Sequence, residues 1–167
     1  MLKDLDKIAL GGGCHWCTEA VFQHLKGVVN VEQGYVCSIE ENSTFSEAVI
    51  VHFNPSTISL DQLIEIHLYT HQSTSNHSFR SKYRSAIYYF EELQKNHAEN
   101  ILIKLQSDFS KSIITKVLKF ADFQSSREEI QDYYTKDPKK PFCQLYIEPK
   151  LKILMEQFND NVNISKT

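Results

Sequence analysis

Near the start of the chain stands the run Gly11-Gly12-Gly13-Cys14-His15-Trp16-Cys17-Thr18-Glu19. Residues 7–10 before it have the character of a short strand, and residues 18–26 after it have the pattern of a helix that Gly27 closes. We therefore expect Cys14 at or near a helix N-terminus, where free backbone N–H groups and the helix dipole favour a negative charge. The pattern predicts a lowered pKa for this thiol, and hence a reactive nucleophile.

The second cysteine of this run, Cys17, lies one helical turn after Cys14, and Cα atoms at that spacing are within reach of a disulfide. The Cys-x-x-Cys spacing after a strand allows three interpretations: a thioredoxin-like dithiol, half of a zinc site, or one reactive cysteine beside an incidental neighbour. In a fourth interpretation both cysteines fill the core as small apolar side chains. The rest of the chain has to decide among them.

The composition suits one compact domain, because 41% of the 167 residues are hydrophobic. We expect a single domain over residues 1–158 and a polar, frayed tail over residues 159–167. The net charge of -3 and the scattered lysines offer no basic stripe for nucleic acid. No signal peptide or membrane-spanning run is visible, so we expect a cytoplasmic protein that uses neither nucleic acid nor a membrane. In a reducing compartment its four cysteines indicate catalysis or metal binding.

Apolar periodicity divides the rest of the chain into further strands and helices. We expect strands over residues 28–37, 47–53, 86–90, 113–120 and 142–147, and helices over residues 59–71, 91–109, 126–134 and 149–158. These elements alternate irregularly, which indicates an α+β domain with a mixed sheet and helices packed against it.

A carboxylate and a loop stand out as candidate site elements. Glu47 begins a strand with two apolar faces, typical of a central strand, which places it near the core boundary; the alternative is an exposed strand end. The longest loop, residues 72–82, leads to Tyr83, and such loops commonly carry sites. His67 and His71 are four residues apart on one helix face, where such histidines more often pack than bind a metal.

Taken together, these motifs resemble the methionine sulfoxide reductase A family. Gly13-Cys14-His15-Trp16 is similar to the family's Gly-Cys-Phe-Trp, Gly34-Tyr35 to its Gly-Tyr, Glu47-Ala48-Val49 to the end of its His-Ala-Glu-Val-Val, and Tyr83-Arg84-Ser85 to its Tyr-Arg-Ser. Cys143 followed by Ile147-x-Pro149-Lys150 extends the match. One motif alone would be weak, but five in the same order at compatible spacing are specific.

The resemblance implies an α/β roll and an enzyme that reduces the S epimer of methionine sulfoxide, free or in proteins, without a cofactor or a metal. It implies that Cys14 attacks the sulfoxide sulfur and becomes a sulfenic acid. Glu47 would protonate the oxygen as a general acid, a role that partial burial favours. Tyr35 and Tyr83 would donate hydrogen bonds to that oxygen. Trp16 would form an apolar wall for the substrate methyl group.

Several residues depart from the family's pattern. His15 replaces the family's Phe, so the methyl pocket is more polar, and a protonated His15 would further lower the pKa of the neighbouring thiol. Cys17 stands where the family usually has Gly. The family's acidic residue before the Tyr-Arg-Ser motif falls on Ser78, and the His of His-Ala-Glu becomes Phe45.

The resemblance also implies that an intramolecular disulfide recycles Cys14 and that thioredoxin reduces this disulfide. We expect Cys143 as the resolving cysteine, because it matches the family's C-terminal recycling cysteine and follows a turn at Pro141. Cys17 is the next candidate because of its proximity, and Cys37 is the last.

Two other functions remain open from the sequence. A thioredoxin-like dithiol oxidoreductase would use Cys14 and Cys17, but it leaves the motifs around Glu47 without a role. A zinc-binding module would combine these two cysteines with Cys37 and Cys143 or a histidine. A structural zinc site normally presents two paired cysteine knuckles, whereas here the second pair is scattered.

Overall fold

Six strands form one sheet in the computed structural model, which describes residues 5–163. They are β1 (Asp6–Gly11), β2 (Val28–Cys37), β3 (Ser46–Phe53), β4 (Ala86–Tyr89), β5 (Lys116–Lys119) and β6 (Asp122–Ser125), in the order β5-β4-β1-β3-β2-β6. Neighbouring strands are antiparallel except for the parallel pair β4 and β5. The mixed sheet that the sequence predicts is confirmed.

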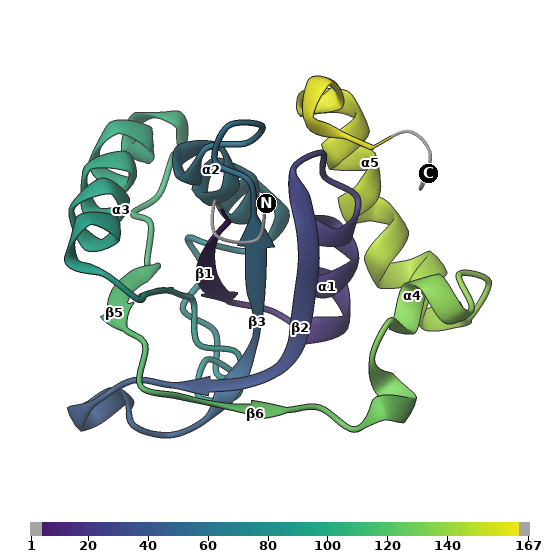
Figure 1. Ribbon diagram of the computed structural model, residues 1–167, viewed down its shortest axis with the longest axis horizontal. Helices are drawn as coiled ribbons and strands as arrows, with labels where there is room; N and C mark the ends of the chain where they lie inside the picture. Colours follow the sequence, from purple (N-terminus) through teal and green to yellow (C-terminus); the bar gives the residue numbers. More distant parts are fainter. Residues whose placement is uncertain (1–4, 164–167) are drawn as a thin grey trace.

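The two edge strands of this sheet are nearly consecutive in the chain, and this closes the sheet into a roll. Only Phe120 and Ala121 separate β5 from β6, although these strands lie at opposite ends of the strand order. The Phe120 N–H donates to the Tyr89 carbonyl in β4 at 2.9 Å, and the Ala121 N–H donates to the Cys37 carbonyl in β2 at 3.0 Å. The sheet therefore curls until its two edges meet, and Figure 1 shows the chain passing directly from β5 to β6.

The helices pack on the outside of this curled sheet (Figure 1). They are α1 (His15–Gln23), α2 (Leu60–Thr70), α3 (Glu92–Leu105), α4 (Tyr133–Lys136) and α5 (Glu148–Gln157). α1 contacts β2, β3, α4 and α5, and α2 contacts both α3 and α5. α2 starts with the predicted capping box, in which the Ser59 hydroxyl accepts from the Gln62 N–H at 3.1 Å and the Gln62 side chain accepts from the Ser59 N–H at 3.0 Å.

The central strand β3 is covered on both faces, as predicted. Val49 and Val51 belong to the main core, which also includes apolar side chains of α1, α2 and α5. Ala48 and Ile50 face a smaller cluster around Tyr88 on the opposite side of the sheet. A carboxylate at the head of this strand is thus carried into the protein rather than left at its surface.

The helix after the glycine run begins and ends earlier than predicted. Cys14 is its N-cap residue, and α1 starts at His15 instead of at residue 18. Gly27 is not its cap but lies in the following turn with φ of +89°, where a Cβ would approach Ile58 Cγ2 to 2.8 Å. Glycine is required there by the backbone and by the packing.

The helix predicted over residues 126–134 is wrong. A 3₁₀ turn (Glu128–Ile130) and the short α4 replace it, with Asp132 between them at φ of +55°. The buried Glu19 carboxylate in α1 accepts from the N–H groups of Asp132 and Tyr133, at 2.9 and 3.3 Å, and so withdraws these donors from a continuous helix.

The strand predicted over residues 142–147 is also wrong, because a π-helix (Cys143–Ile147) leads directly into α5. Cys143 and Ile147 are fully buried four residues apart, as on one helix face. Pro149 has no N–H to donate to the carbonyl one turn earlier, and the wider π turn lies at that place.

The start of the predicted tail is packed rather than frayed. Val162 is fully buried and forms a bridge with Leu25, and the Lys26 N–H donates to the Asn161 carbonyl at 2.7 Å. The tail prediction is therefore wrong for residues 159–163, and residues 164–167 lie outside the described residues. Among the helices of the described chain, none has the length and apolar character needed to cross a bilayer.

Candidate active site

Cys14 joins the glycine run to α1. Its carbonyl accepts from the N–H groups of Cys17 and Thr18, at 3.0 and 3.2 Å, and so starts the helix. Gly12 has φ of +148°, and a Cβ at this position would lie 2.5 Å from the His71 ring. Only glycine lets the chain pass there, and the Cys14 side chain is left half-buried at the start of the helix.

A cavity of about 430 Å³ opens on one side of Cys14, and we call it the Glu47 cavity. It is lined by Cys14, His15, Trp16, Tyr35, Phe45, Glu47, Lys82, Tyr83, Ile130 and Phe142. The list contains the predicted nucleophile, the predicted acid, both predicted tyrosines and the two predicted substrate-binding residues. Residues from the glycine run, β2, β3 and the loop before β4 therefore meet at one place.

Glu47 is 6% exposed, so the exposed strand end is not its environment. Its Oε1 accepts from the His15 backbone N–H at 3.2 Å, and its Oε2 lies 3.7 Å from Lys82 Nζ. Its own N–H donates to the Lys82 carbonyl at 3.1 Å. The carboxyl group is fixed at the start of α1, where an acid could reach an atom bound next to Cys14.

His15 turns its ring toward the sheet. Nδ1 lies 2.9 Å from the Gly34 carbonyl oxygen, and Nε2 lies 3.5 Å from Glu47 Oε1. Burial lowers the pKa of His15, with the Gly34 carbonyl and the Glu47 carboxylate acting in the opposite direction. The expectation that a protonated His15 lowers the Cys14 pKa is therefore not supported. The ring nitrogen is directed at the Glu47 carboxyl group instead.

Trp16 is held in an aromatic group that forms one wall of the Glu47 cavity. Its ring stacks on Tyr133 at 4.1 Å with an interplanar angle of 5°, and Phe142 meets it edge-on at 5.1 Å. The sequence did not indicate Phe142, because its segment was interpreted as a strand. It did not indicate Lys82 either, because no motif pointed to it, and Ile130 was noted only as a departure from the family's late Tyr-His-Gln, which is Glu129-Ile130-Gln131 here.

Cys14 and Cys17 form a coupled thiol pair. Their hydrogen bond and burial raise the pKa of Cys14, whereas the same hydrogen bond lowers the pKa of Cys17 and the Lys150 charge adds to this lowering. The prediction of a lowered Cys14 pKa is therefore wrong for the resting protein. Cys17 is therefore the more acidic thiol of the pair.

Comparison with known proteins gives the same family as the motifs. The model of the family "Peptide methionine sulfoxide reductase" matches residues 6–162. This chain belongs to that family. A peptide methionine sulfoxide reductase MsrA of Sulfolobus acidocaldarius is 35% identical over 174 residues, which cover 96% of this chain and 99% of the relative.

Solved structures with the same fold come from Saccharomyces cerevisiae. Mxr1 in its reduced form matches with a TM-score of 0.76 and 23% identity, over 84% of this chain and 90% of that chain. Mxr1 in complex with Trx2 matches with a TM-score of 0.64 and 23% identity, over 78% and 86% of the two chains. The curled sheet with its outer helices is thus the fold of solved structures, and the predicted family resemblance is confirmed.

A second cavity in this reductase-family fold, of about 360 Å³, opens on the other side of Cys14. We call it the Lys150 cavity. It is lined by Gly12, Gly13, Cys14, Cys17, His71, Gln72, His77, Phe79, Tyr83, Phe142, Tyr146 and Lys150. Cys17, which stands where the family usually has Gly, belongs to this cavity and not to the Glu47 cavity.

The Lys150 ammonium group lines the same cavity as Cys14 and Cys17. Its Nζ donates to the carbonyl of Thr70, the last residue of α2, where the helix dipole favours a positive charge. Among residues 5–163 it forms no ion pair with a carboxylate. Burial lowers its pKa, and the charges of Cys17 and Cys14 act in the opposite direction. Cys17, whose pKa the Lys150 charge lowers, is therefore the acidic group closest in effect to this ammonium.

The two other cysteines line neither cavity, although Cys143 follows Phe142, which lines both. Cys143 is fully buried, and its thiol donates to the Asp137 carbonyl at 3.4 Å. Cys37 is buried at the end of β2. All four cysteines are free. The structure therefore places Cys17 against Cys14, and it does not place Cys143 or Cys37 in a cavity with Cys14.

The histidine pair of α2 is used for packing. His67 Nε2 donates to the Gly11 carbonyl at 2.8 Å, and the His71 ring stacks on His67 at a centroid distance of 4.1 Å. Within the described part of the chain, no three side chains of His, Cys, Asp or Glu are grouped so that they could hold a metal ion. The zinc-module hypothesis has no site there.

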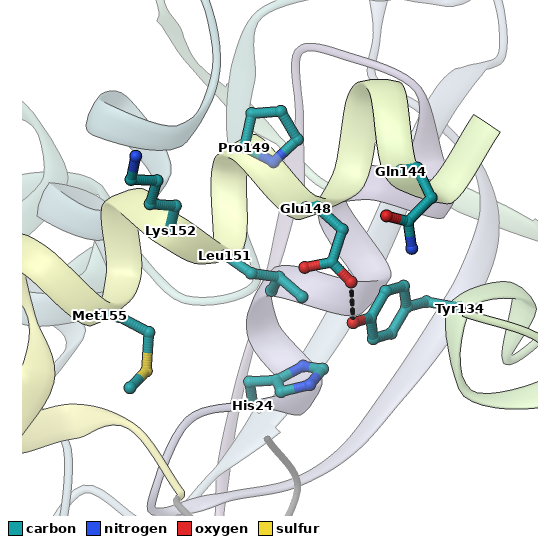
Figure 2. Close-up of a pocket in the computed structure, with 8 residues that line it drawn as sticks. All are labelled: His24, Tyr134, Gln144, Glu148, Pro149, Leu151, Lys152 and Met155. Atoms are coloured by element: carbon teal, nitrogen blue, oxygen red, sulfur yellow. Dashed lines mark hydrogen bonds between the residues drawn. The ribbon is translucent and has the colours of Figure 1, made fainter. Parts of the chain in front are cut away.

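Another cavity, of about 630 Å³, is lined by none of the cysteines. Figure 2 shows its lining, which comes from the end of α1, from α4, from the π-helix and from α5: His24, Tyr134, Gln144, Glu148, Pro149, Leu151, Lys152 and Met155. The Tyr134 hydroxyl donates to Glu148 Oε1 at 2.5 Å and thereby joins α4 to α5. None of the residues predicted for the site lines this cavity.

Proposed function

We propose that this chain reduces the S epimer of methionine sulfoxide to methionine, with Cys14 as the nucleophile. The observation that carries the proposal is the meeting of a half-buried thiol and a buried carboxyl group, Glu47, in one cavity. Family membership supports the reaction class, because its description names this reductase. A sulfoxide needs both partners, since its sulfur takes a soft nucleophile and its oxygen leaves only when protonated.

In the reductase step, Cys14 passes its proton to Cys17 and its sulfur attacks the sulfoxide sulfur. Glu47 gives a proton to the sulfoxide oxygen. The S–O bond breaks, an S–OH bond forms on Cys14, and methionine leaves as the sulfide. Tyr35 and Tyr83 line the same cavity, and we assign them hydrogen bonds to the oxygen as it gains charge.

The substrate methyl group would lie against the aromatic wall that Trp16 forms with Tyr133 and Phe142. This rigid wall on one side and the acid on the other give a fixed handedness at sulfur. His15 lines the cavity as predicted, and its ring nitrogens are directed at Gly34 and Glu47.

We propose that Cys17 closes the disulfide with Cys14 during recycling. Its thiol attacks the Cys14 sulfenic acid, an S–S bond forms, the S–OH bond breaks and water leaves. Hydrogen bonding to Cys14 and the Lys150 charge both favour Cys17 as thiolate, the form that attacks. The role of Cys143 as resolving cysteine stays a prediction, and from its buried place it would need the π-helix to move.

We infer that thioredoxin reduces this disulfide in turn, because Mxr1, a protein of the same fold, has been solved in complex with Trx2. A cytoplasmic location is part of the proposal, since four free cysteines suit a reducing compartment. A simple dithiol oxidoreductase would use the same cysteine pair, but it gives the buried Glu47 no function.

The test is an assay of the purified chain with separated S and R epimers of methionine sulfoxide and dithiothreitol as reductant. We expect turnover of the S epimer only, and loss of all turnover in Cys14→Ser. Equal rates on the two epimers, or an active Cys14→Ser variant, would contradict the proposal. A chain that reduces disulfides but not sulfoxides would support the dithiol alternative instead.

A further inference from the structure

His15 and Glu47 form a buried pair that the reductase chemistry described above does not require. The two residues are 3% and 6% exposed, and His15 Nε2 lies 3.5 Å from Glu47 Oε1. The resemblance places Phe at this position, so the imidazole is a feature of this chain. Burying an imidazole beside a carboxyl group is costly unless their protons are hydrogen-bonded, so the position of each proton matters.

The Gly34 carbonyl fixes the proton on one nitrogen. A carbonyl oxygen can only accept a hydrogen bond, so His15 Nδ1, at 2.9 Å, must carry a hydrogen. In the neutral ring Nε2 is then a bare lone pair that faces a carboxyl oxygen. Two lone pairs at this distance repel each other in a buried site, unless a proton lies between them.

We propose that His15 and Glu47 hold one proton between them, and that His15 is the positioning residue that keeps this proton available for the sulfoxide oxygen. The inference rests on the proposed function, because it concerns the acid of that reaction. The pair is neutral overall when the carboxyl holds the proton. It is an internal ion pair when the ring holds the proton, and either form is less costly to bury than a lone carboxylate.

Several other groups face this pair and decide on which side the proton lies. The exposed Lys82 ammonium, 3.7 Å from Oε2, favours the ionised carboxylate. Burial lowers the pKa of His15, which favours the neutral ring and leaves Nε2 as an acceptor. The remaining groups are the thiols of Cys14 and Cys17, the Tyr35 ring in β2, whose centroid lies 5.1 Å from that of His15, and Tyr83, which lines the same cavity. In the proposed arrangement the Nε2 acceptor counteracts the effect of Lys82 on the carboxyl group.

The first test is the pH dependence of a single turnover without reductant, measured as methionine formed by wild type and by His15→Gln. The Gln amide can still donate to Gly34, but it cannot share a proton and its N–H groups stabilise the ionised carboxylate. We expect His15→Gln to be about 10-fold slower than wild type at pH 8 and within about 2-fold of it at pH 6. An equal loss at both pH values would contradict the proposal.

A double-mutant cycle tests whether His15 acts through Glu47. In a Glu47→Gln background, His15→Gln should cause no further pH-dependent loss, whereas independent, multiplying losses would overturn the proposal. If wild type fails to reduce either epimer, the proposed function fails and this kinetic test does not apply.

The pair can also be tested without turnover. In ¹⁵N NMR spectra of the wild type at pH 7, the His15 signal, assigned by its absence from His15→Gln, should show a protonated Nδ1 and a hydrogen-bonded Nε2. Infrared difference spectra against Glu47→Gln should show a protonated carboxyl band. A free, unbonded Nε2 together with an ionised Glu47 would overturn the proposal whatever the activity.

Discussion

The two cavities on either side of Cys14 share Cys14, Tyr83 and Phe142 but carry opposite chemistry. The Glu47 cavity holds a buried carboxyl group, whereas the Lys150 cavity holds Cys17 and an ammonium group that pairs with no carboxylate of residues 5–163. A leaving oxygen needs an acid, and an attacking thiol needs a nearby cation. In the proposed mechanism, the Cys14 sulfur takes part in two half-reactions, and each uses the groups of one cavity.

Replacing the acid should give the largest effect on the reductase side alone. Glu47→Gln keeps the size and polarity of the side chain but has no proton to give, so we expect single-turnover reduction at pH 8 to fall at least about 100-fold. The loss should shrink at low pH, where solvent can protonate the sulfoxide. Stopped-flow or quenched-flow detection of methionine measures it.

Glu32→Gln is the matched control for this variant. Glu32 also pairs with a histidine, His52, at 2.6 Å, but it lies outside both cavities. It should reduce substrate at the wild-type rate. A Glu47→Gln variant as fast as Glu32→Gln at pH 8 would remove the acid from the mechanism and with it the contrast between the two sides.

Removing the second thiol should leave the Glu47 side intact. We expect Cys17→Ser to form one equivalent of methionine rapidly and then to lose about 100-fold in thioredoxin-dependent turnover, because serine cannot close a disulfide. Mass-spectrometric mapping after one equivalent of substrate should show a Cys14–Cys17 linkage in wild type. A Cys14–Cys143 linkage, with turnover lost in Cys143→Ser instead, would show that the first sequence expectation was correct.

The two sides also differ in how far the sequence could predict them. The Glu47 cavity is made of residues inside local motifs, such as Cys14 at a helix start and Glu47 at the head of a doubly apolar strand. Local signals of this kind depend on neighbouring residues in the chain and not on distant contacts. The predicted residues line one cavity. The closure of the roll follows from the two residues between β5 and β6. The sequence did not predict β6 itself, since its short polar segment has little apolar pattern.

The Lys150 side depends on contacts between distant segments, which periodicity does not reveal. The segment around Cys143 was interpreted as a strand, although its buried positions recur every four residues. Because of that error, the sequence did not predict that Phe142 and Lys150 line the site. The Cys14 pKa was misjudged for a related reason, because the helix N-terminus was visible in the sequence and the coupling to a buried Cys17 was not.

A smaller effect is expected from removing the cation of the Lys150 cavity. Lys150→Met keeps the length and apolar stem but not the charge, so the Cys17 thiolate loses stabilisation, and we expect disulfide formation at pH 7 to slow about 10-fold. The rate of the first methionine formed should stay within about 2-fold of wild type. Rapid-quench alkylation of free thiols measures the disulfide step.

The effect of Lys150→Met on disulfide formation should depend on pH. Because burial lowers the Lys150 pKa, its ammonium loses its proton at a lower pH than an ordinary lysine does. The difference between wild type and Lys150→Met should therefore be full at neutral pH and shrink as pH rises. Lys152→Met, on the same helix with an exposed ammonium 4.0 Å from Glu156, is the control and should change neither step. Equal slowing in both variants would mean that general surface charge, not the cavity, is responsible.

The smallest effect is expected from the cysteine that belongs to neither side. Cys37 is buried at the end of β2, where its carbonyl accepts from Ala121 across the closure of the roll. Cys37→Ser places a hydroxyl in this buried position, so we expect a stability loss of about 1–2 kcal/mol in urea unfolding. Thioredoxin-dependent turnover should remain within about 2-fold of wild type, and Cys37→Ala should behave alike in turnover. If Cys37→Ser instead lost turnover as Cys17→Ser does, Cys37 would take part in recycling. The assignment of recycling to the Lys150 cavity and of reduction to the Glu47 cavity would then be wrong.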